Sequence, residues 1–157
     1  MDKIAISTNG YNRLNSRLAA LKQVERPAIL DAIQKAREHG DLSENADYST
    51  AKDAERAINS EIRRLEALKD KSDVIDVAAL SGDIVMFGAI VRVEDEDGKT
   101  VVYRILSEYE SDLKNGIIAL TSPVARALIG KKQGDSVVIT TPAGTRELEI
   151  MEIKYGV

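Results

Sequence analysis

The spacing of apolar residues divides the chain into two halves with different periods. From Ser7 to about His39, leucine and isoleucine recur every three or four residues, which is the spacing of one face of an α-helix. The stripe consists of Leu14, Leu18, Leu21, Ile29, Leu30 and Ile33. Pro27 falls inside this span and predicts a kink, because proline lacks the N–H that an inner helical turn needs. Ser7 or Thr8 is a suitable N-cap, and Gly40 suits the left-handed conformation that ends a helix.

A second helical pattern runs from about Glu44 to Lys69. Its stripe consists of Ala51, Ala54, Ile58, Ile62, Leu65 and Leu68. Two long helices joined by a few residues must lie antiparallel, and each offers its partner only a narrow apolar seam. At 1.5 Å per residue, the resulting coiled-coil hairpin is roughly 40–45 Å long.

Beyond the region of Ala78 to Gly82 the pattern changes to that of β-strands. β-branched runs occupy residues 83–95, 100–108 and 116–122, and residues 135–155 indicate two more strands around Pro142-Ala143-Gly144. Asp97-Gly98 is a good hairpin turn, and residues 122–130 indicate a short helix with Pro123 in its first turn. We therefore expect an α+β fold. A helical hairpin over residues 1–77 should precede a compact antiparallel sheet with one helix over residues 78–157.

Composition restricts the partners of this chain. Aromatic residues make up 4% and cysteine is absent, so the core must be aliphatic, and disulfides and thiolate metal sites are excluded. The absence of cysteine fits a cytoplasmic protein. No apolar run approaches the length of a membrane span, so we expect no membrane partner. The net charge of −4 argues against wholesale binding to a nucleic-acid backbone. Scarce aromatics and narrow seams lead us to expect a monomer.

Residues 38–47, where the hairpin turns, carry four acidic residues and no lysine or arginine. These are Glu38, Asp41, Glu44 and Asp47. One explanation is local: Asp41 and Glu44 have the spacing of a capping box, and Ser43 could also cap the second helix. A calcium loop is excluded, because Ala46 stands where that loop needs glycine and Lys52 where it needs glutamate.

The other explanation is an incomplete metal site. Asp41 and Glu44 are three residues apart, so their carboxylates could converge on one divalent ion. Two ligands are too few to hold Mg²⁺ firmly, since Mg²⁺ takes six and gives up water reluctantly. Such a pair makes sense if another molecule supplies the remaining ligands.

Two motifs give the chain a resemblance to a known family. "AREHGDLSENADY" at the hairpin turn, together with "SPVARALIGKKQGD" about 75 residues later, resembles the GreA/GreB family of bacterial transcript-cleavage factors. The resemblance extends over essentially the whole chain. Asp47 stands where the family mostly has glutamate, and Ser49-Thr50 where it often has His-Ala, but neither departure affects Asp41 or Glu44.

The resemblance implies a mechanism for the acidic turn. Members of this family insert their coiled coil through the secondary channel of bacterial RNA polymerase when that enzyme has backtracked. The acids matching Asp41 and Glu44 help to hold a Mg²⁺ ion beside the polymerase's own aspartates. Cleavage then removes the 3′ end of the nascent RNA. The implied protein is an activator of the polymerase's nuclease and not an enzyme itself, and it shares the Mg²⁺ with the polymerase.

The resemblance also assigns roles to basic residues behind the turn. Arg37 and Lys52 match a basic patch that contacts the extruded RNA 3′ end, and Arg56 could extend that patch. The alternative is that these are ordinary solvated helix charges, paired with acids on the same helix. Tyr48 either packs the two helices together or contacts a nucleotide.

The C-terminal half is expected from the resemblance to have an FKBP-like fold that docks on polymerase. Ser122 and Pro123 match the docking surface, and the same two residues are suited to starting a helix. An isomerase pocket is not expected, because Phe87 and a few tyrosines cannot line one.

Two further functions stay open. One is an inhibitor of polymerase that occupies the same channel without stimulating cleavage. The other is a chaperone-like binding module that grasps with the hairpin. A grasping arm would need an apolar surface at the turn, which offers only Leu42 and Ala46.

Overall fold

The computed structural model of this 157-residue chain describes residues 2–40 and 45–156. By its internal contacts the chain forms two units. We call Tyr11–Ser72 the hairpin unit, and Lys3–Gly10 together with Asp73–Val157 the C-terminal unit. The helical pattern gave no sign that residues 3–10 pack with the C-terminal half.

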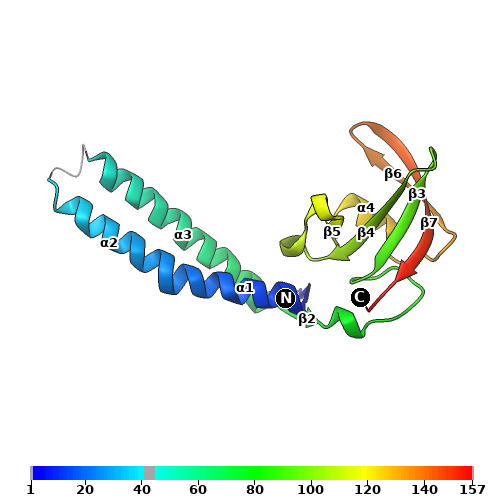
Figure 1. Cartoon of the computed structure of the whole chain (residues 1–157), viewed down its shortest axis with the longest axis horizontal. Coiled ribbons are helices and arrows are strands. Elements are labelled where there is room, and N and C mark those ends of the chain that lie inside the picture. Colours follow the sequence, from blue (N-terminus) through cyan, green and yellow to red (C-terminus); the bar gives the residue numbers. More distant parts are fainter. Residues whose placement is uncertain (1, 41–44, 157) are drawn as a thin grey trace. The chain divides into compact units, whose positions relative to one another are not determined.

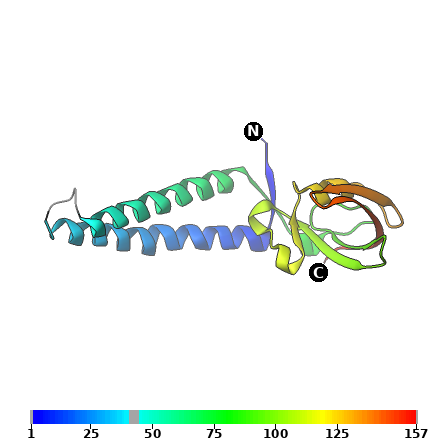
Figure 2. The same ribbon diagram turned by 90° about the horizontal axis from the view of Figure 1, so that it is seen from above.

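The hairpin unit is built from helices throughout. Its elements are α1 (Thr8–Ala20), a π-helical turn (Leu21–Glu25), α2 (Arg26–Arg37) and α3 (Ala46–Lys71). Helices α2 and α3 lie side by side in both views of the ribbon (Figures 1 and 2). The predicted pair of long helices is therefore present.

One apolar seam forms the interior of the hairpin unit. Its buried residues are Leu14, Leu18, Leu21, Ile33, Ala36, Ala51, Ile62 and Leu65. Leu30 was expected in this seam but is 48% exposed, so that prediction was wrong. An ion pair reinforces the seam, since the Arg17 guanidinium donates two hydrogen bonds of 2.9 Å to the Glu61 carboxylate on α3.

Pro27 lies just beyond the π-helical turn, with Arg26 between them. The N–H of Arg26 donates to the carbonyl of Leu21, five residues earlier, which widens the helix by one residue. Pro27 then occupies the first turn of α2, where a missing N–H is tolerated best. The irregularity expected at the proline thus takes the form of a π-turn just before it.

The C-terminal unit contains a five-stranded sheet. Its strands are β3 (Ile90–Asp95), β4 (Thr100–Leu106), β5 (Ile117–Ala119), β6 (Ser136–Thr141) and β7 (Gly144–Lys154). Their order is β5-β4-β3-β7-β6. All neighbours are antiparallel except β4 and β5, which pair in parallel. The α+β class is confirmed, but the sheet is mixed and not purely antiparallel as expected.

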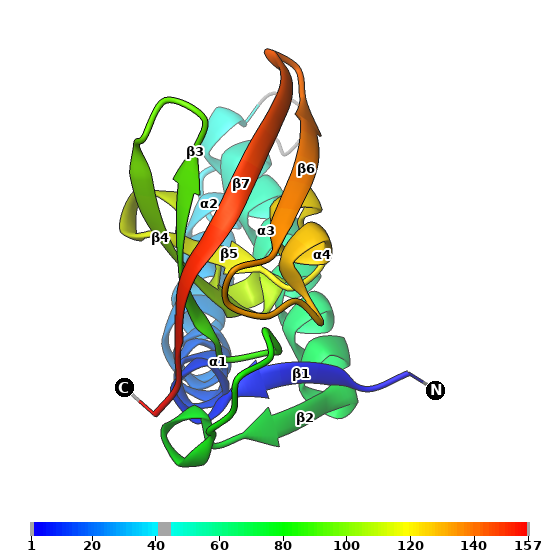
Figure 3. The ribbon, with the colours of Figure 1, turned by 90° about the vertical axis from the view of Figure 1, so that its right-hand side faces the viewer.

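Helix α4 (Pro123–Leu128) packs beside β6, and 3₁₀ turns complete the connections (Figure 3). These turns are η3 (Val77–Ala79), η4 (Glu108–Glu110) and η5 (Leu113–Asn115). The buried cluster of this unit is Val85, Ala89, Val91, Val93, Ile105, Ile118, Ala125, Leu128, Val137, Ile139, Leu148 and Ile150. The core is aliphatic, as the composition required.

The apolar run at residues 83–95 forms a shorter strand than its composition suggests. Only Ile90–Asp95 joins the sheet, although Val85 and Ala89 are buried as well. Gly88 has φ of +88°, which breaks the extended backbone just before the strand. Val85 and Ala89 therefore reach the core from a loop and not from a strand.

A small two-stranded sheet was not predicted. It pairs β1 (Ile4–Ser7) with β2 (Ser72–Ile75) (Figure 3). Ile6 and Ser7 are both buried while Ile4 is 38% exposed, so the four residues of β1 show no two-residue alternation that would reveal a strand. Within the described residues, no helix is both long and apolar enough to cross a membrane.

Candidate functional site

The turn of the hairpin lies between Arg37, the last residue of α2, and Ala46, the first residue of α3. Gly40 has φ of +115°, the positive value expected of the residue that ends this helical run. Asp41 and Glu44, the predicted metal-holding carboxylates, lie outside the described residues.

Asn45 is the cap of α3. Its side-chain oxygen accepts from the Tyr48 N–H at 3.0 Å, and its side-chain nitrogen donates to the Ala36 carbonyl of α2 at 2.8 Å. One amide thus starts α3 and ties it to the end of α2. Asn45 is therefore the cap of α3, whereas Asp41 and Ser43, the residues expected to cap the helix, lie outside the described residues.

The cap at Asn45 bears on the capping explanation for Asp41 and Glu44. The local explanation for Asp41 and Glu44 was that their spacing forms a capping box at the helix start. Because the cap position belongs to Asn45, both acids precede the cap. Sequence alone could not distinguish these candidates, since aspartate, serine and asparagine are about equally good N-caps.

The predicted basic residue on α2 contacts an aromatic residue on α3. The Arg37 guanidinium carbon lies 5.9 Å from the centre of the Tyr48 ring, within cation–π range. Tyr48 therefore links the two helices just behind the turn. Arg37 itself is exposed.

The two predicted basic residues on α3 lie beside acids of the same helix. The Lys52 amine is 2.7 Å from the Glu55 carboxylate, and the Arg56 guanidinium is 2.5 Å from Asp53. The Arg56 pair is exposed on both sides, so it contributes little to stability. The structure brings Arg37 of α2 near Tyr48 of α3. Lys52 and Arg56 lie further along α3.

Ser122 and Pro123 open helix α4. The Ser122 hydroxyl oxygen accepts from the Ala125 N–H at 3.2 Å, and Pro123 is the first helical residue. The predicted helix-starting role of both residues is confirmed. Pro123 is exposed, which leaves it accessible to a partner.

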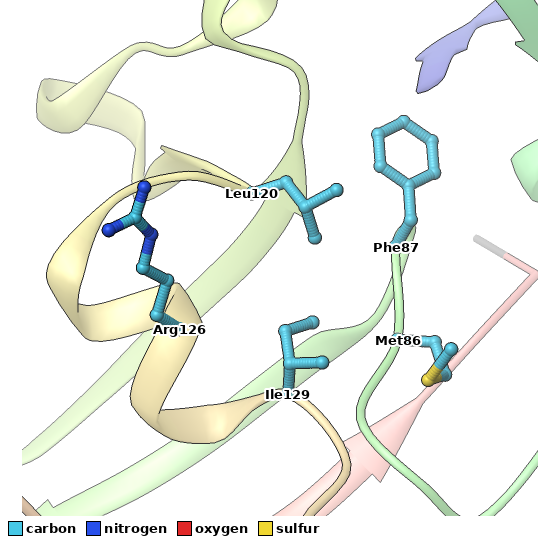
Figure 4. A pocket seen from close by; sticks show the side chains of 5 residues that line it. All are labelled: Met86, Phe87, Leu120, Arg126 and Ile129. Carbon is cyan, nitrogen blue, oxygen red and sulfur yellow. The ribbon is translucent and has the colours of Figure 1, made fainter. Parts of the chain in front are cut away.

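A pocket of about 360 Å³ lies beside α4. It is lined by Met86, Phe87, Leu120, Arg126 and Ile129 (Figure 4). Leu120 and Ile129 flank α4, and Met86 and Phe87 come from the loop before β3, with Phe87 as the one aromatic residue of the lining. Met86 is 54% exposed, so the pocket opens onto an apolar surface. Sequence reasoning did not find this site, because its residues are scattered along the chain.

Tyr155 fixes the loop that carries Met86. Its hydroxyl accepts from the Met86 N–H at 2.8 Å and donates to the Ile84 carbonyl. Burial raises the pKa of the Tyr155 hydroxyl above its ordinary value.

Within residues 2–40 and 45–156, no group of three or more histidine, aspartate or glutamate side chains is arranged to hold a metal ion. Asp41 and Glu44 offer hard oxygen donors of the kind that Mg²⁺ prefers, but only two of the six that it takes.

Two family models together match nearly the whole chain. Residues 4–74 match the family model described as transcription elongation factor, N-terminal. Residues 80–155 match the model described as transcription elongation factor, GreA/GreB, C-term. The chain belongs to the GreA/GreB family of transcription elongation factors.

Relatives within the GreA/GreB family match the chain from end to end. The transcription elongation factor GreA of Rhodospirillum rubrum is 45% identical over 157 residues, covering 99% of this chain and 100% of the relative. GreA of Azorhizobium caulinodans is 48% identical with the same coverage. Among solved structures, the GreA factor homolog 1 (Gfh1) of Thermus thermophilus is similar at 24% identity and a TM-score of 0.46. The match covers 97% of this chain and 99% of that one.

Proposed function

We propose that this protein stimulates cleavage of the nascent transcript by bacterial RNA polymerase. The hairpin would enter the secondary channel of a backtracked polymerase and deliver Asp41 and Glu44 to its active site. The observation that supports this most strongly is the cap of α3. Asn45 starts the helix and ties it to α2, so the two acids are not needed for that purpose.

The proposed role of Asp41 and Glu44 is to complete a Mg²⁺ site together with the polymerase. Bound there, Mg²⁺ would supply charge stabilisation and an activated water for phosphodiester hydrolysis. The two carboxylates contribute negative charge and oxygen ligands, and the hairpin positions them. The polymerase supplies the remaining ligands and the active site, so the protein alone should not cleave RNA.

The residues behind the turn suit a role toward RNA in the same complex. Arg37 and the exposed pair of Arg56 with Asp53 are positive groups that an RNA phosphate could engage. Lys52 is more enclosed, with 30% of its side chain exposed. We assign the extruded RNA 3′ end as the partner of this patch.

The C-terminal unit is proposed to dock on the polymerase through the start of α4. Pro123 is exposed there, and the pocket that Met86 and Arg126 help to line lies beside the same helix. An apolar pocket with one arginine at its edge suits a protein partner, because anchor residues at interfaces fill such pockets.

The proposal is tested with Asp41→Asn and Glu44→Gln in a cleavage assay on backtracked complexes. Each substitution keeps the shape of the side chain and removes its charge. We expect stimulated cleavage to fall by about 10²-fold or more, because the ligand charge at the metal is lost. Binding to polymerase should change by less than about threefold, since the docking surface lies elsewhere. Normal cleavage by both variants would contradict the proposal.

A further inference from the structure

Glu110 stands out because it is buried. It is 4% exposed and is the one acidic or basic residue in the buried class among the described residues. An ionised carboxylate inside a protein is costly unless hydrogen bonds replace its lost water. The hydrogen-bond donors around the Glu110 carboxylate therefore indicate which parts of the fold this residue holds together.

Two segments far apart in the sequence supply those partners. Ser107 donates its N–H at 3.2 Å and its hydroxyl at 2.7 Å to one carboxylate oxygen of Glu110. Ser7 donates its N–H to the same oxygen at 3.2 Å, and its hydroxyl donates to the other oxygen. Four donors converge on the carboxylate, two of them from a residue 103 positions away.

The first turn of α1 is seated on this carboxylate. The Ser7 oxygen accepts from the Gly10 N–H at 3.1 Å, as the side chain of a helix N-cap does. A Cβ on Gly10 would lie 2.4 Å from the Glu110 carboxylate carbon, closer than carbon atoms approach. Any larger residue at position 10 would therefore have to displace the Glu110 side chain. We call Ser7, Gly10, Ser107 and Glu110 the root clamp.

The root clamp holds the first turn of α1, a helix that starts in the C-terminal unit and continues into the hairpin unit. Residues 3–10 pack with the C-terminal unit, and α1, which runs without a break from Thr8 to Ala20, continues from Tyr11 onward in the hairpin unit. Whatever fixes the first turn of α1 therefore fixes the base of the hairpin.

We propose that Glu110 is a positioning residue that anchors the base of the hairpin to the C-terminal unit. In this role it holds the first turn of α1 on the C-terminal unit, from which that helix continues into the hairpin unit. The consequence for cleavage rests on the proposed function, whereas the anchoring itself does not. Anchoring matters because reacting groups misplaced by about 1 Å can lose up to 10²-fold in rate.

The first test needs no polymerase. Because the chain has no cysteine, spin labels can be attached at Ala57→Cys in α3 and Ser136→Cys in β6, both exposed positions. Pulsed electron resonance then measures the distribution of distances between the labels. We expect a narrow distribution with Glu110, and a distribution at least about twice as wide with Glu110→Ala. Equal widths would overturn the proposal.

A matched variant separates geometry from charge. Glu110→Gln keeps an oxygen that can accept from both serine N–H groups and adds an amide that can donate to the Ser7 oxygen. We expect Glu110→Gln to preserve the narrow distribution. Should Glu110→Ala fail to fold, Gly10→Ala breaks the clamp from the helix side, where alanine would otherwise favour the helix. A narrow distribution in Gly10→Ala would equally overturn the proposal.

The second test uses backtracked polymerase complexes and saturating protein. We expect Glu110→Ala to lower the saturated cleavage rate on the order of tenfold while the half-saturating concentration changes by less than about threefold. Glu110→Gln should restore the rate to within about twofold. A variant that was merely unstable would instead lose folded protein and apparent affinity together.

The two proposals fail in different ways. If the unmodified protein stimulates no cleavage, the proposed function is wrong, and the distance distributions alone decide the anchoring. If the unmodified protein cleaves and Glu110→Ala cleaves equally fast, the positioning role is wrong and the proposed function stands.

Discussion

The two units of this protein are stabilised in different ways. The hairpin unit buries eight apolar residues along one seam, with ion pairs such as Arg17 with Glu61 beside it. The C-terminal unit buries a cluster of twelve residues drawn from all five strands, α4 and the loop before β3. The seam is buried between two helices alone, with no further layer packed around them. Charged residues can therefore occupy the end of the hairpin without being buried. A core enclosed by a sheet and a helix instead provides a shaped surface, such as the pocket beside α4.

The largest predicted effects come from truncating the interior of either unit. Leu65 in α3 is 1% exposed and Ile150 in β7 is fully buried. Leu65→Ala and Ile150→Ala should each cost about 2–5 kcal/mol, from lost burial and the cavity left behind. Hydrogen exchange read by mass spectrometry should show faster exchange in the hairpin unit for Leu65→Ala, and across the sheet for Ile150→Ala.

The exposed Leu30 provides the control for that comparison. Leu30→Ala removes the same atoms as Leu65→Ala from a side chain that is 48% exposed, so the expected cost is below about 1 kcal/mol. Faster exchange throughout both units in Leu65→Ala would contradict the division into two units, because it would mean that they unfold as one.

A smaller effect is expected at the cap of α3. Asn45→Ala removes both of its hydrogen bonds and should destabilise the hairpin by about 1 kcal/mol. Asn45→Asp keeps the acceptor for the Tyr48 N–H and loses only the bond to Ala36, so most of the stability should remain. Exchange at the Tyr48 amide measures the difference. Unchanged exchange in Asn45→Ala would mean that another residue caps α3.

The smallest effect concerns pH. The hydrogen bond from Arg17 lowers the pKa of Glu61 below its ordinary value of 4.5. A carboxylate with a depressed pKa stabilises the folded state above its unfolded pKa, and that contribution is lost as the pH falls through the folded pKa. Glu61→Gln should therefore lower the melting temperature of the hairpin slightly at pH 7, with the difference shrinking below about pH 4.5.

Glu66 is the matched control for this pH effect. Its ion pair with Lys22 has a single contact and is about half exposed, so Glu66→Gln should change the melting temperature less than Glu61→Gln at pH 7. A Glu61→Gln difference that stays constant from pH 7 to pH 3 would show that the Arg17 pair does not depend on the Glu61 charge.

The periodic spacing of apolar residues predicted most of the fold. The helical stripes and the β-branched runs predicted the hairpin, the sheet and α4, because burial imposes a period on each of them. The parallel pairing of β4 with β5 could not be foreseen, since it depends on how η4 and η5 turn the chain between the two strands. Strand β1 was missed because its four residues merge with the start of a helix.

The candidate site was predictable where one segment supplies it and not where distant segments meet. The acidic turn and the basic residues behind it lie within twenty residues of one another. The root clamp joins Ser7 to Glu110, and only folding brings them together. Ser107 and Glu110 do have the spacing of a capping box, a local signal for half of that clamp.

The central claim is that the hairpin turn supports cleavage by polymerase, and the most direct test follows RNA length in a backtracked elongation complex. The RNA is labelled near its 3′ end, and the protein is added with Mg²⁺. The account predicts rapid shortening by a few nucleotides that requires Mg²⁺ and polymerase. Unchanged RNA length, or slower elongation without shortening, would contradict it, and the second result would indicate an inhibitor that occupies the same channel.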